Sequence, residues 1–414
     1  MHFREKLQNY ANLLISHGLN VQEGQCVNIT GEIYHKELIQ ILVEAAYKKG
    51  AKFVNVDFID PVLTKHRLDF SVCEEHLEYV PTYIPKKFED FVEEGVAVLR
   101  LCGSEAPDIL AHSSAQKINK MQGSIRKSLK KYYSEGVSKS KIQWTVAAAA
   151  TPAWGKKVFP ELEEKKAFEA LWDEIFTICR CDKPSTIELW KEHNLLLKKR
   201  AKHLTDMQIK MLHFEGPGTD LRVYLSPKSI FKAGGDATEN GIPFEANIPT
   251  EECFTTPDYR LTEGTVAVTR PVAVNGQLVK GLNLKFEQGK IVFFSASEGE
   301  DTFSAYIQND PGASRLGEVA LVGTDSPVFK SGRIFEEILY DENAACHIAI
   351  GSAYKFCIDG GSEMSQEELN AIGCNDSRVH TDFMISSEQV SVTAENFQGD
   401  SIKLIDNGKW SLHI

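Results

Sequence analysis

The first residues of the chain alternate apolar and polar positions with the period of a helix. Phe3, Leu7, Tyr10, Leu14 and Ile15 fall on one face, so this spacing predicts an amphipathic helix. A secretory signal peptide would instead have an unbroken apolar centre. We therefore expect the chain to begin with a helix of the folded protein.

Up to about residue 150, short apolar runs with strand character alternate with helical stretches. The predicted strands are Cys26–Thr30, Phe53–Ile59, Val96–Leu101 and Gln143–Ala150, and Glu37–Lys49 is a predicted helix that ends before Gly50. Strands separated by helices indicate βαβ units and a mostly parallel sheet. This part of the chain contains neither of the glycine-rich motifs GxGxxG and GxxxxGK[ST], so the sequence does not support nucleotide binding.

The pattern changes from about Lys210 onward. Short strand-like runs are separated by turn sequences such as Asn275-Gly276 and Asn407-Gly408, which favour hairpins. The predicted strands are Leu212–Phe214, Leu221–Leu225, Thr265–Pro271, Leu278–Phe286, Lys290–Ala296, Val390–Thr393, Ser401–Ile405 and Trp410–His413. Helices are expected near Glu300–Gln308 and Ser365–Ala371.

A length of 414 residues exceeds what one hydrophobic core usually supports, so we expect two domains. Lys165–His203 is rich in helix formers and is predicted to be a helical bridge between them. The fold class is therefore α/β. Residues 1–200 form an N-terminal α/β domain with a mostly parallel sheet, and residues 201–414 form a β-rich α/β domain at the C-terminus.

Composition and charge narrow the range of possible functions. The content of 42% hydrophobic and 25% charged residues is ordinary for a globular protein. A formal net charge of −12 argues against nucleic acid or an anionic membrane as a partner, and no apolar run approaches the roughly 18 residues that span a bilayer. The nine cysteines show no CxxC spacing, which favours reduced thiols in a cytoplasmic protein.

Two pairs of imidazole and carboxylate residues are the first candidates for chemistry. Glu342 and His347 form one pair, and His380 and Asp382 form the other. In an extended segment, His-x-Asp places both side chains on one face. Neutral imidazole with carboxylate is a ligand set for zinc, cobalt, manganese or magnesium. Alternatively, these are four polar loop residues without a common purpose.

Two more glutamates lie in segments that suit ligands. Glu252 falls between Pro249 and Pro257, in a stretch of mixed polarity unlike a packed strand, and Glu318 precedes an apolar run. A charge beside such a run is costly unless it is paired or ligated. Each glutamate alone is more typical of a surface ion pair. Together with the two pairs they make six candidate ligands, a number that suits two adjacent ions sharing one carboxylate.

At these positions the sequence resembles the dinuclear metallo-aminopeptidases of the aminopeptidase T, PepS and AmpS group, also called thermophilic metalloproteases. The matching segments are Pro249–Pro257, Leu316–Ala320, Leu339–Ile350 and Val379–Ile385. The resemblance covers both halves of the chain, although its specific motifs all lie in the second. It departs from the family pattern at Cys253 and Ser386, which are not ligands.

This resemblance implies an enzyme that removes single amino acids from the free N-terminus of short peptides. It implies two divalent ions (Zn, Co, Mn or Mg) bound by Glu252, Glu318, Glu342, His347, His380 and Asp382, with Tyr354 as a catalytic residue. It also implies a homodimer with an enclosed cavity, to which the N-terminal domain would limit access.

A peptidase of this kind also needs a base that moves a proton from water to the leaving amine. Glu251 is our candidate, because it adjoins a ligand without being one; alternatively, it is a solvated surface residue. Tyr354 could donate a hydrogen bond to the oxyanion, or could be an ordinary half-buried tyrosine. Two other functions stay open: another dinuclear hydrolase (an amidohydrolase or phosphoesterase), or a metal-stabilised binding protein without turnover.

Overall fold

The computed structural model describes residues 1–412 of the chain and divides into two compact units. The first contains Met1–His193 and Gly235–Thr250, and the second contains Asn194–Gly234 and Glu251–Ile414. The predicted strand Trp410–His413 is observed as β21 (Lys409–Trp410), and His413 lies outside the described residues.

The first unit is built on a parallel sheet of five strands in the order β2-β1-β3-β4-β9. All four predicted strands of this half are present, and the expected mostly parallel sheet is confirmed. The strands are β1 (Cys26–Glu32), β2 (Phe53–Ile59), β3 (Ala97–Cys102), β4 (Trp144–Ala148) and β9 (Asn247–Ile248).

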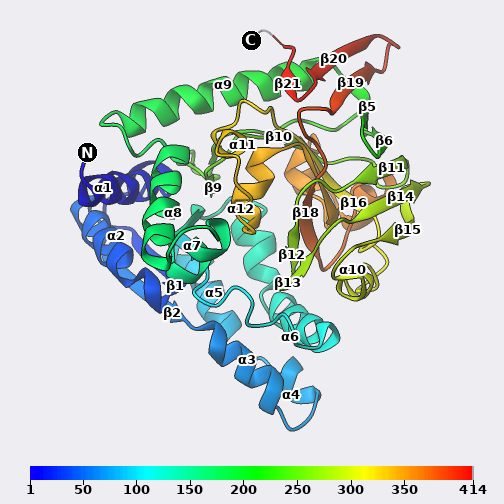
Figure 1. Cartoon of the computed structure of the whole chain (residues 1–414). Coiled ribbons are helices and arrows are strands. Elements are labelled where there is room, and N and C mark those ends of the chain that lie inside the picture. The colour runs from blue at the N-terminus through cyan, green and yellow to red at the C-terminus, as the bar shows by residue number, and fades with distance from the viewer. Residues whose placement is uncertain (413–414) are drawn as a thin grey trace. The chain divides into compact units, whose positions relative to one another are not determined.

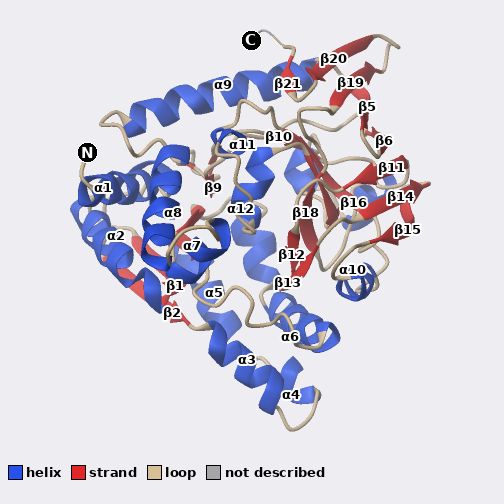
Figure 2. Cartoon of the chain, viewed as in Figure 1, coloured by secondary structure: helices blue, strands red, loops and turns tan. Residues whose placement is uncertain are grey.

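Helices of the first unit connect and cover these strands (Figures 1 and 2). Because parallel strands run in one direction, each connection must return to the other end of the sheet, usually through a helix. The main helices are α1 (Phe3–Leu13), α2 (Lys36–Lys48), α3 (Pro61–Phe70), α5 (Tyr83–Glu94), α6 (Ala115–Ser128), α7 (Pro152–Val158) and α8 (Glu164–Ile178), with the short α4 (Glu75–Glu78).

The predicted helical bridge Lys165–His203 is two helices rather than one. After α8 ends at Ile178, α9 begins at Thr186 and continues to Asp206. Arg180 adopts a positive φ of 60° in the break, and Pro184 there cannot donate a backbone hydrogen bond. Most residues of this stretch favour a helix, so the sequence did not indicate the interruption.

The second unit contains two antiparallel sheets. The larger has eight strands in the order β15-β14-β11-β6-β5-β19-β20-β21, seen as red arrows in Figure 2. Its strands are β5 (Ile209–Gly216), β6 (Thr219–Tyr224), β11 (Glu263–Ala267), β14 (Asn283–Glu287), β15 (Lys290–Ser295), β19 (Ser391–Asn396), β20 (Ser401–Asp406) and β21. The predicted β-rich character of this half is confirmed.

Three hairpin turns of the second unit follow the predicted turn chemistry. Asn275-Gly276, Gln288-Gly289 and Asn407-Gly408 each form a two-residue connection in which both residues have positive φ. This is the type I′ geometry that matches the twist of the flanking strands. The predicted strand Leu278–Phe286, by contrast, is interrupted, because Gly281 has a φ of 59°. It divides into β13 (Gln277–Val279), which pairs with β12 (Val272–Val274), and β14.

The smaller sheet has four strands in the order β10-β16-β17-β18. They are β10 (Cys253–Thr255), β16 (Leu316–Leu321), β17 (His347–Gly351) and β18 (His380–Met384). One face of this sheet joins the inner face of the eight-stranded sheet in a single hydrophobic core. The core includes Val319, Leu321, Ile348, Ile350 and Phe383 from the smaller sheet, and Leu212, Phe214, Leu221, Val223 and Phe286 from the larger.

Short helices complete the second unit. They are α10 (Glu300–Ile307), α11 (Pro327–Lys330), α12 (Ile338–Asp341) and α13 (Gln366–Ala371), so both predicted helices, near Glu300–Gln308 and Ser365–Ala371, are present. Among residues 1–412, none of the helices combines the length and apolar character that a bilayer crossing requires.

Candidate metal centre

The second face of the four-stranded sheet carries the polar residues that the sequence singles out. Val319, Ile348 and Phe383 point into the core, and side chains alternate along a strand. Glu318, His347 and Asp382 therefore project from the opposite face. A single period-two pattern thus buries one face in the core and gathers charged groups on the other.

Strand register brings these residues close together. Glu318 pairs with Ala349, and Ala349 pairs with Asp382. Glu318 and Asp382 therefore lie in one row across the sheet, with only a methyl group between them. In the next row, His347 lies opposite Ala320. The small side chains of the alanines leave room for the longer polar side chains on either side.

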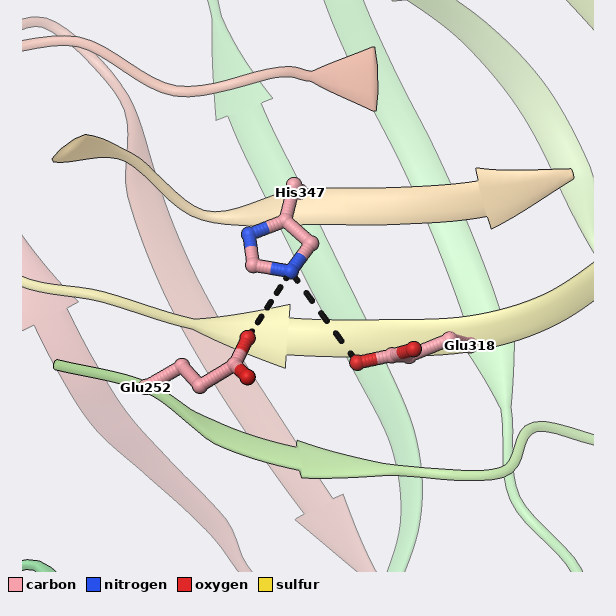
Figure 3. Close-up of side chains that lie close together, drawn as sticks. All are labelled: Glu252, Glu318 and His347. Carbon is pink, nitrogen blue, oxygen red and sulfur yellow. Dashed lines mark ion pairs between the residues drawn. The ribbon is translucent and has the colours of Figure 1, made fainter. Parts of the chain in front are cut away.

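The first cluster consists of Glu252, Glu318 and His347 (Figure 3). His347 Nε2 lies 3.0 Å from Glu252 Oε2 and 4.0 Å from Glu318 Oε1. All three side chains are almost completely shielded from solvent. Two carboxylates that face one buried imidazole nitrogen make an arrangement suited to a divalent ion.

The second cluster consists of Glu318, His380 and Asp382. His380 Nε2 lies 3.4 Å from Glu318 Oε2 and 3.5 Å from Asp382 Oδ1. Glu318 thus belongs to both clusters, with one carboxylate oxygen directed to each histidine. The side chains of His380 and Asp382 keep 12% and 13% of their surface exposed, so the second cluster is the more open one.

Backbone carbonyls orient both imidazoles. His347 Nδ1 lies 3.1 Å from Ala345 O, and His380 Nδ1 lies 2.7 Å from Ser352 O. A carbonyl only accepts hydrogen bonds, so each Nδ1 carries a proton and each Nε2 is the ring nitrogen that faces the carboxylates. A hydrogen bond of this kind at the second nitrogen is the usual support of a metal-binding histidine.

Glu342 belongs to neither cluster, but charges from both clusters act on it. It lies in the 3₁₀ turn Glu342–Ala344 after α12 and is buried. Burial raises the pKa of Glu342 well above its ordinary value, and the negative charges of Asp382, Glu252 and Glu318 raise it further. The carboxyl group of Glu342 therefore interacts electrostatically with acidic residues of both clusters.

Burial dominates the electrostatics of the clusters. It raises the pKa of Glu318 to about 7, although the hydrogen bond with His380 acts in the opposite direction. Burial lowers the pKa of His347, but the negative charge of Glu252, which lies 3.0 Å away, outweighs it and raises the pKa to about 10. A buried group of carboxylates this dense needs a compensating positive charge.

Two buried oxygen atoms of the clusters have the surroundings expected of metal ligands. Glu252 Oε2 and Asp382 Oδ1 are out of contact with solvent and accept no hydrogen bond from any residue within 1–412. A buried carboxylate oxygen without a donor is costly. Oxygen ligands directed at a divalent ion would be satisfied without one, which agrees with the mixed oxygen and nitrogen donors around them.

Asn343 holds the backbone of the segment that carries Glu251. The sequence alone had not assigned a role to Asn343. Asn343 is fully buried. Its Oδ1 accepts a 2.6 Å hydrogen bond from the backbone N–H of Glu251, and its Nδ2 donates to Leu339 O. Glu251 is itself buried and adjoins Glu252, but belongs to neither cluster. Its position directly after Glu342 is the sequence feature that could have indicated the role of Asn343.

Tyr354 follows β17 in a loop held close to the second cluster. Its backbone carbonyl accepts a 2.8 Å hydrogen bond from Thr256 Oγ1, and its ring lies 4.9 Å from that of His380. Burial first, and then the charges of Glu318 and Asp382, raise the pKa of Tyr354. The phenol therefore keeps its proton and can donate it in a hydrogen bond. The residue as a whole nevertheless keeps about 36% of its surface exposed.

The glycine at the end of β17 is needed for this loop. Gly351 has a φ of 119°, and a Cβ atom there would lie 2.1 Å from Val379 O. Any other residue would push β17 away from the chain that leads into β18. Gly351 thus allows the next residue, Ser352, to present its carbonyl to His380.

Comparison with known proteins gives one consistent result. The family model described as "Thermophilic metalloprotease (M29)" matches residues 3–410. Aminopeptidase T of Thermus aquaticus is 37% identical over 408 residues, and Aminopeptidase AmpS of Bacillus subtilis is 36% identical over 409 residues; each match covers 99% of both chains. The solved structure of wild-type AmpT from Thermus thermophilus superposes with a TM-score of 0.90 at 36% identity, covering 99% of this chain and 100% of that one.

Proposed function

The chain belongs to the thermophilic metalloprotease (M29) family, and we propose that it releases amino acids one at a time from the free N-terminus of short peptides, using two divalent ions. The family and its aminopeptidase relatives support a metal-dependent aminopeptidase. The observation that carries the two-ion proposal is the position of Glu318, which belongs to both ligand clusters.

Six residues would hold the ions. Glu252 and His347 would bind one ion, His380 and Asp382 the other, and Glu318 would bridge the two, with Glu342 completing the set; the ions would be Zn, Co, Mn or Mg. When bound, such ions activate water and polarise the carbonyl of the scissile bond. Hydrolysis of an aminoacyl p-nitroanilide, measured with and without a chelator, tests the activity and its metal dependence together.

Two further side chains would act on the reacting groups. Glu251 would accept a proton from the attacking water and return it to the leaving amine. Its support is its place: it is buried next to a ligand and anchored through its backbone by Asn343. Tyr354 would donate a hydrogen bond to the oxyanion that forms at the carbonyl.

Replacement of Tyr354 by phenylalanine is expected to lower kcat by about 10²–10³-fold, the usual effect of removing one oxyanion donor. KM and metal content should change little, because the phenol would act mainly in the transition state. Steady-state kinetics and metal analysis of Tyr354→Phe measure both. Tyr224→Phe, in β6 of the larger sheet, is the matched control. Wild-type kcat in Tyr354→Phe would assign Tyr354 to packing alone.

The arginines nearest the ligands in the sequence give no support to a phosphoesterase. Phosphate chemistry would require a cation directed at the metal site. Arg315 donates instead to the backbone carbonyls of Tyr259 and Gln288, and Arg378 is exposed and pairs with Asp310. Neither arginine is directed at the carboxylate groups.

We also expect the protein to be a homodimer. The first unit exposes apolar side chains along and after its edge strand β2, a composition typical of surfaces covered by another chain. They are Phe53, Phe58, Ile59, Val62, Leu63, Phe70 and Val72. Light scattering coupled to size exclusion should give twice the mass of one chain, and Phe70→Glu with Leu63→Glu should shift it to the monomer. A monomeric wild type would contradict this expectation.

We propose a cytoplasmic location because of the state of the cysteines. All nine are free thiols, and most are buried, which is typical of a protein kept in a reducing compartment.

A further inference from the structure

Lys232 extends the row of side chains that leads from the metal centre. It forms an antiparallel bridge with Phe254, in which each backbone N–H donates to the other residue's carbonyl, at 2.8 and 2.9 Å. Directly opposed residues in an antiparallel pair project from the same face. Phe254 is opposite Ala320, so Lys232 projects from the same face of the sheet as the metal-binding residues.

The ammonium group of Lys232 is not used in an ion pair among the described residues. Lys232 is half-buried, and within residues 1–412 no carboxylate forms an ion pair with it. Its charge does act on the buried thiol of Cys357, as do the charges of Glu318 and Glu252. The nearby Lys355, by contrast, donates a hydrogen bond to Gln366. A half-buried cation without an ion-pair partner, in a chain with a net charge of −12, is suited to a negatively charged ligand.

We propose that Lys232 binds the C-terminal carboxylate of a short peptide substrate. This inference rests on the proposed aminopeptidase function. It adds a binding site for the end of the substrate that lies away from the scissile bond. A short peptide is a zwitterion, with an amine at one end and a carboxylate at the other. The sheet face shows the matching order, because the row begins at His347 of the metal centre, which would take the amine, and ends at the ammonium group of Lys232.

The length of the row sets the length of the peptide. Three strand spacings, roughly 14 Å in all, separate the backbone of His347 from that of Lys232. An extended chain covers about 3.3–3.6 Å per residue, and the lysine side chain shortens the remaining gap. A tripeptide or tetrapeptide therefore fits between the metal centre and the ammonium group.

The test compares a peptide acid with its amide. Wild-type enzyme should cleave Leu-Gly-Gly with a kcat/KM about 10–100-fold higher than that for Leu-Gly-Gly-amide, the value of one charge-assisted hydrogen bond. Lys232→Met should bring this ratio close to one, and Lys232→Arg should retain it. Hydrolysis of leucine p-nitroanilide, which has no carboxylate, reports the active fraction of each preparation.

Lys210→Met is the matched control, because it removes one lysine that pairs with Glu395 in the larger sheet; its acid-to-amide ratio should equal that of the wild type. A wild-type ratio near one, or a ratio preserved in Lys232→Met, would overturn the role of Lys232 while aminopeptidase activity stands. An equal loss on acid, amide and anilide would also overturn it. Wild-type enzyme inactive on the anilide would overturn the proposed function itself, and this inference with it.

Discussion

Acetylation of the N-terminus of a peptide is expected to slow its cleavage by at least about 10³-fold, a loss of roughly 4 kcal/mol of transition-state stabilisation. A free amine offers a lone pair to a divalent ion, whereas an amide nitrogen does not. The amine would therefore hold the first peptide bond in register with the reacting groups. Positioning of this kind can contribute several kcal/mol to the rate.

Time-resolved mass spectrometry of a short peptide and its acetylated twin measures this effect. The free peptide should lose residues one at a time from its N-terminus, with no internal fragments at early times. A peptide acetylated on an internal lysine side chain is the control for the acetyl group itself. Equal rates on blocked and free peptides, or early internal cleavage, would remove the exopeptidase assignment and leave the metal centre standing.

Replacement of Glu318 by glutamine should abolish both metal binding and turnover. Glu318 is the only residue in both ligand clusters that the described chain contains, so its loss would weaken both ions at once. Lewis-acid stabilisation by metal ions is worth several kcal/mol, which corresponds to a decrease in kcat/KM of at least about 10³-fold.

The fold should survive this change. Glu318 is buried, and the charges of Asp382 and Glu252 act against its own, so removing one charge relieves repulsion in the metal-free protein. Circular dichroism and metal analysis of Glu318→Gln check both statements. Glu287→Gln, on the exposed side of β14, is the matched control and should behave as the wild type. Full activity in Glu318→Gln would exclude a bridging role.

The sequence predicted the hairpin turns and the half-exposed strands better than the fully buried strands. The type I′ turns at Asn275-Gly276 and Asn407-Gly408 depend on two residues each, and were therefore readable. The strands β16 and β17 were not predicted, because every residue in them is buried. Each contains a single ionisable residue, Glu318 or His347, among small and apolar ones, so the alternation is too weak to indicate a strand.

The segments that carry the candidate ligands were identified from their residue types and not from predicted helices or strands. Glu252 lies just before β10, a strand of three residues, which is too short for any periodic signal. The register that places Glu318, Ala349 and Asp382 in one row joins three segments far apart in the sequence. Neither the carbonyls that orient the histidines nor the bridge between Lys232 and Phe254 has a local sequence signal, because each arises from pairing between distant strands.

The most direct measurement of the central claim is a metal titration of the metal-free enzyme, with bound ions and anilide hydrolysis recorded together. We predict that activity rises to its maximum as the second ion binds, at two ions per chain, and that Glu318→Gln reaches neither the stoichiometry nor the activity. Full activity at one ion per chain, or no dependence on metal at all, would contradict the two-metal centre built from these clusters.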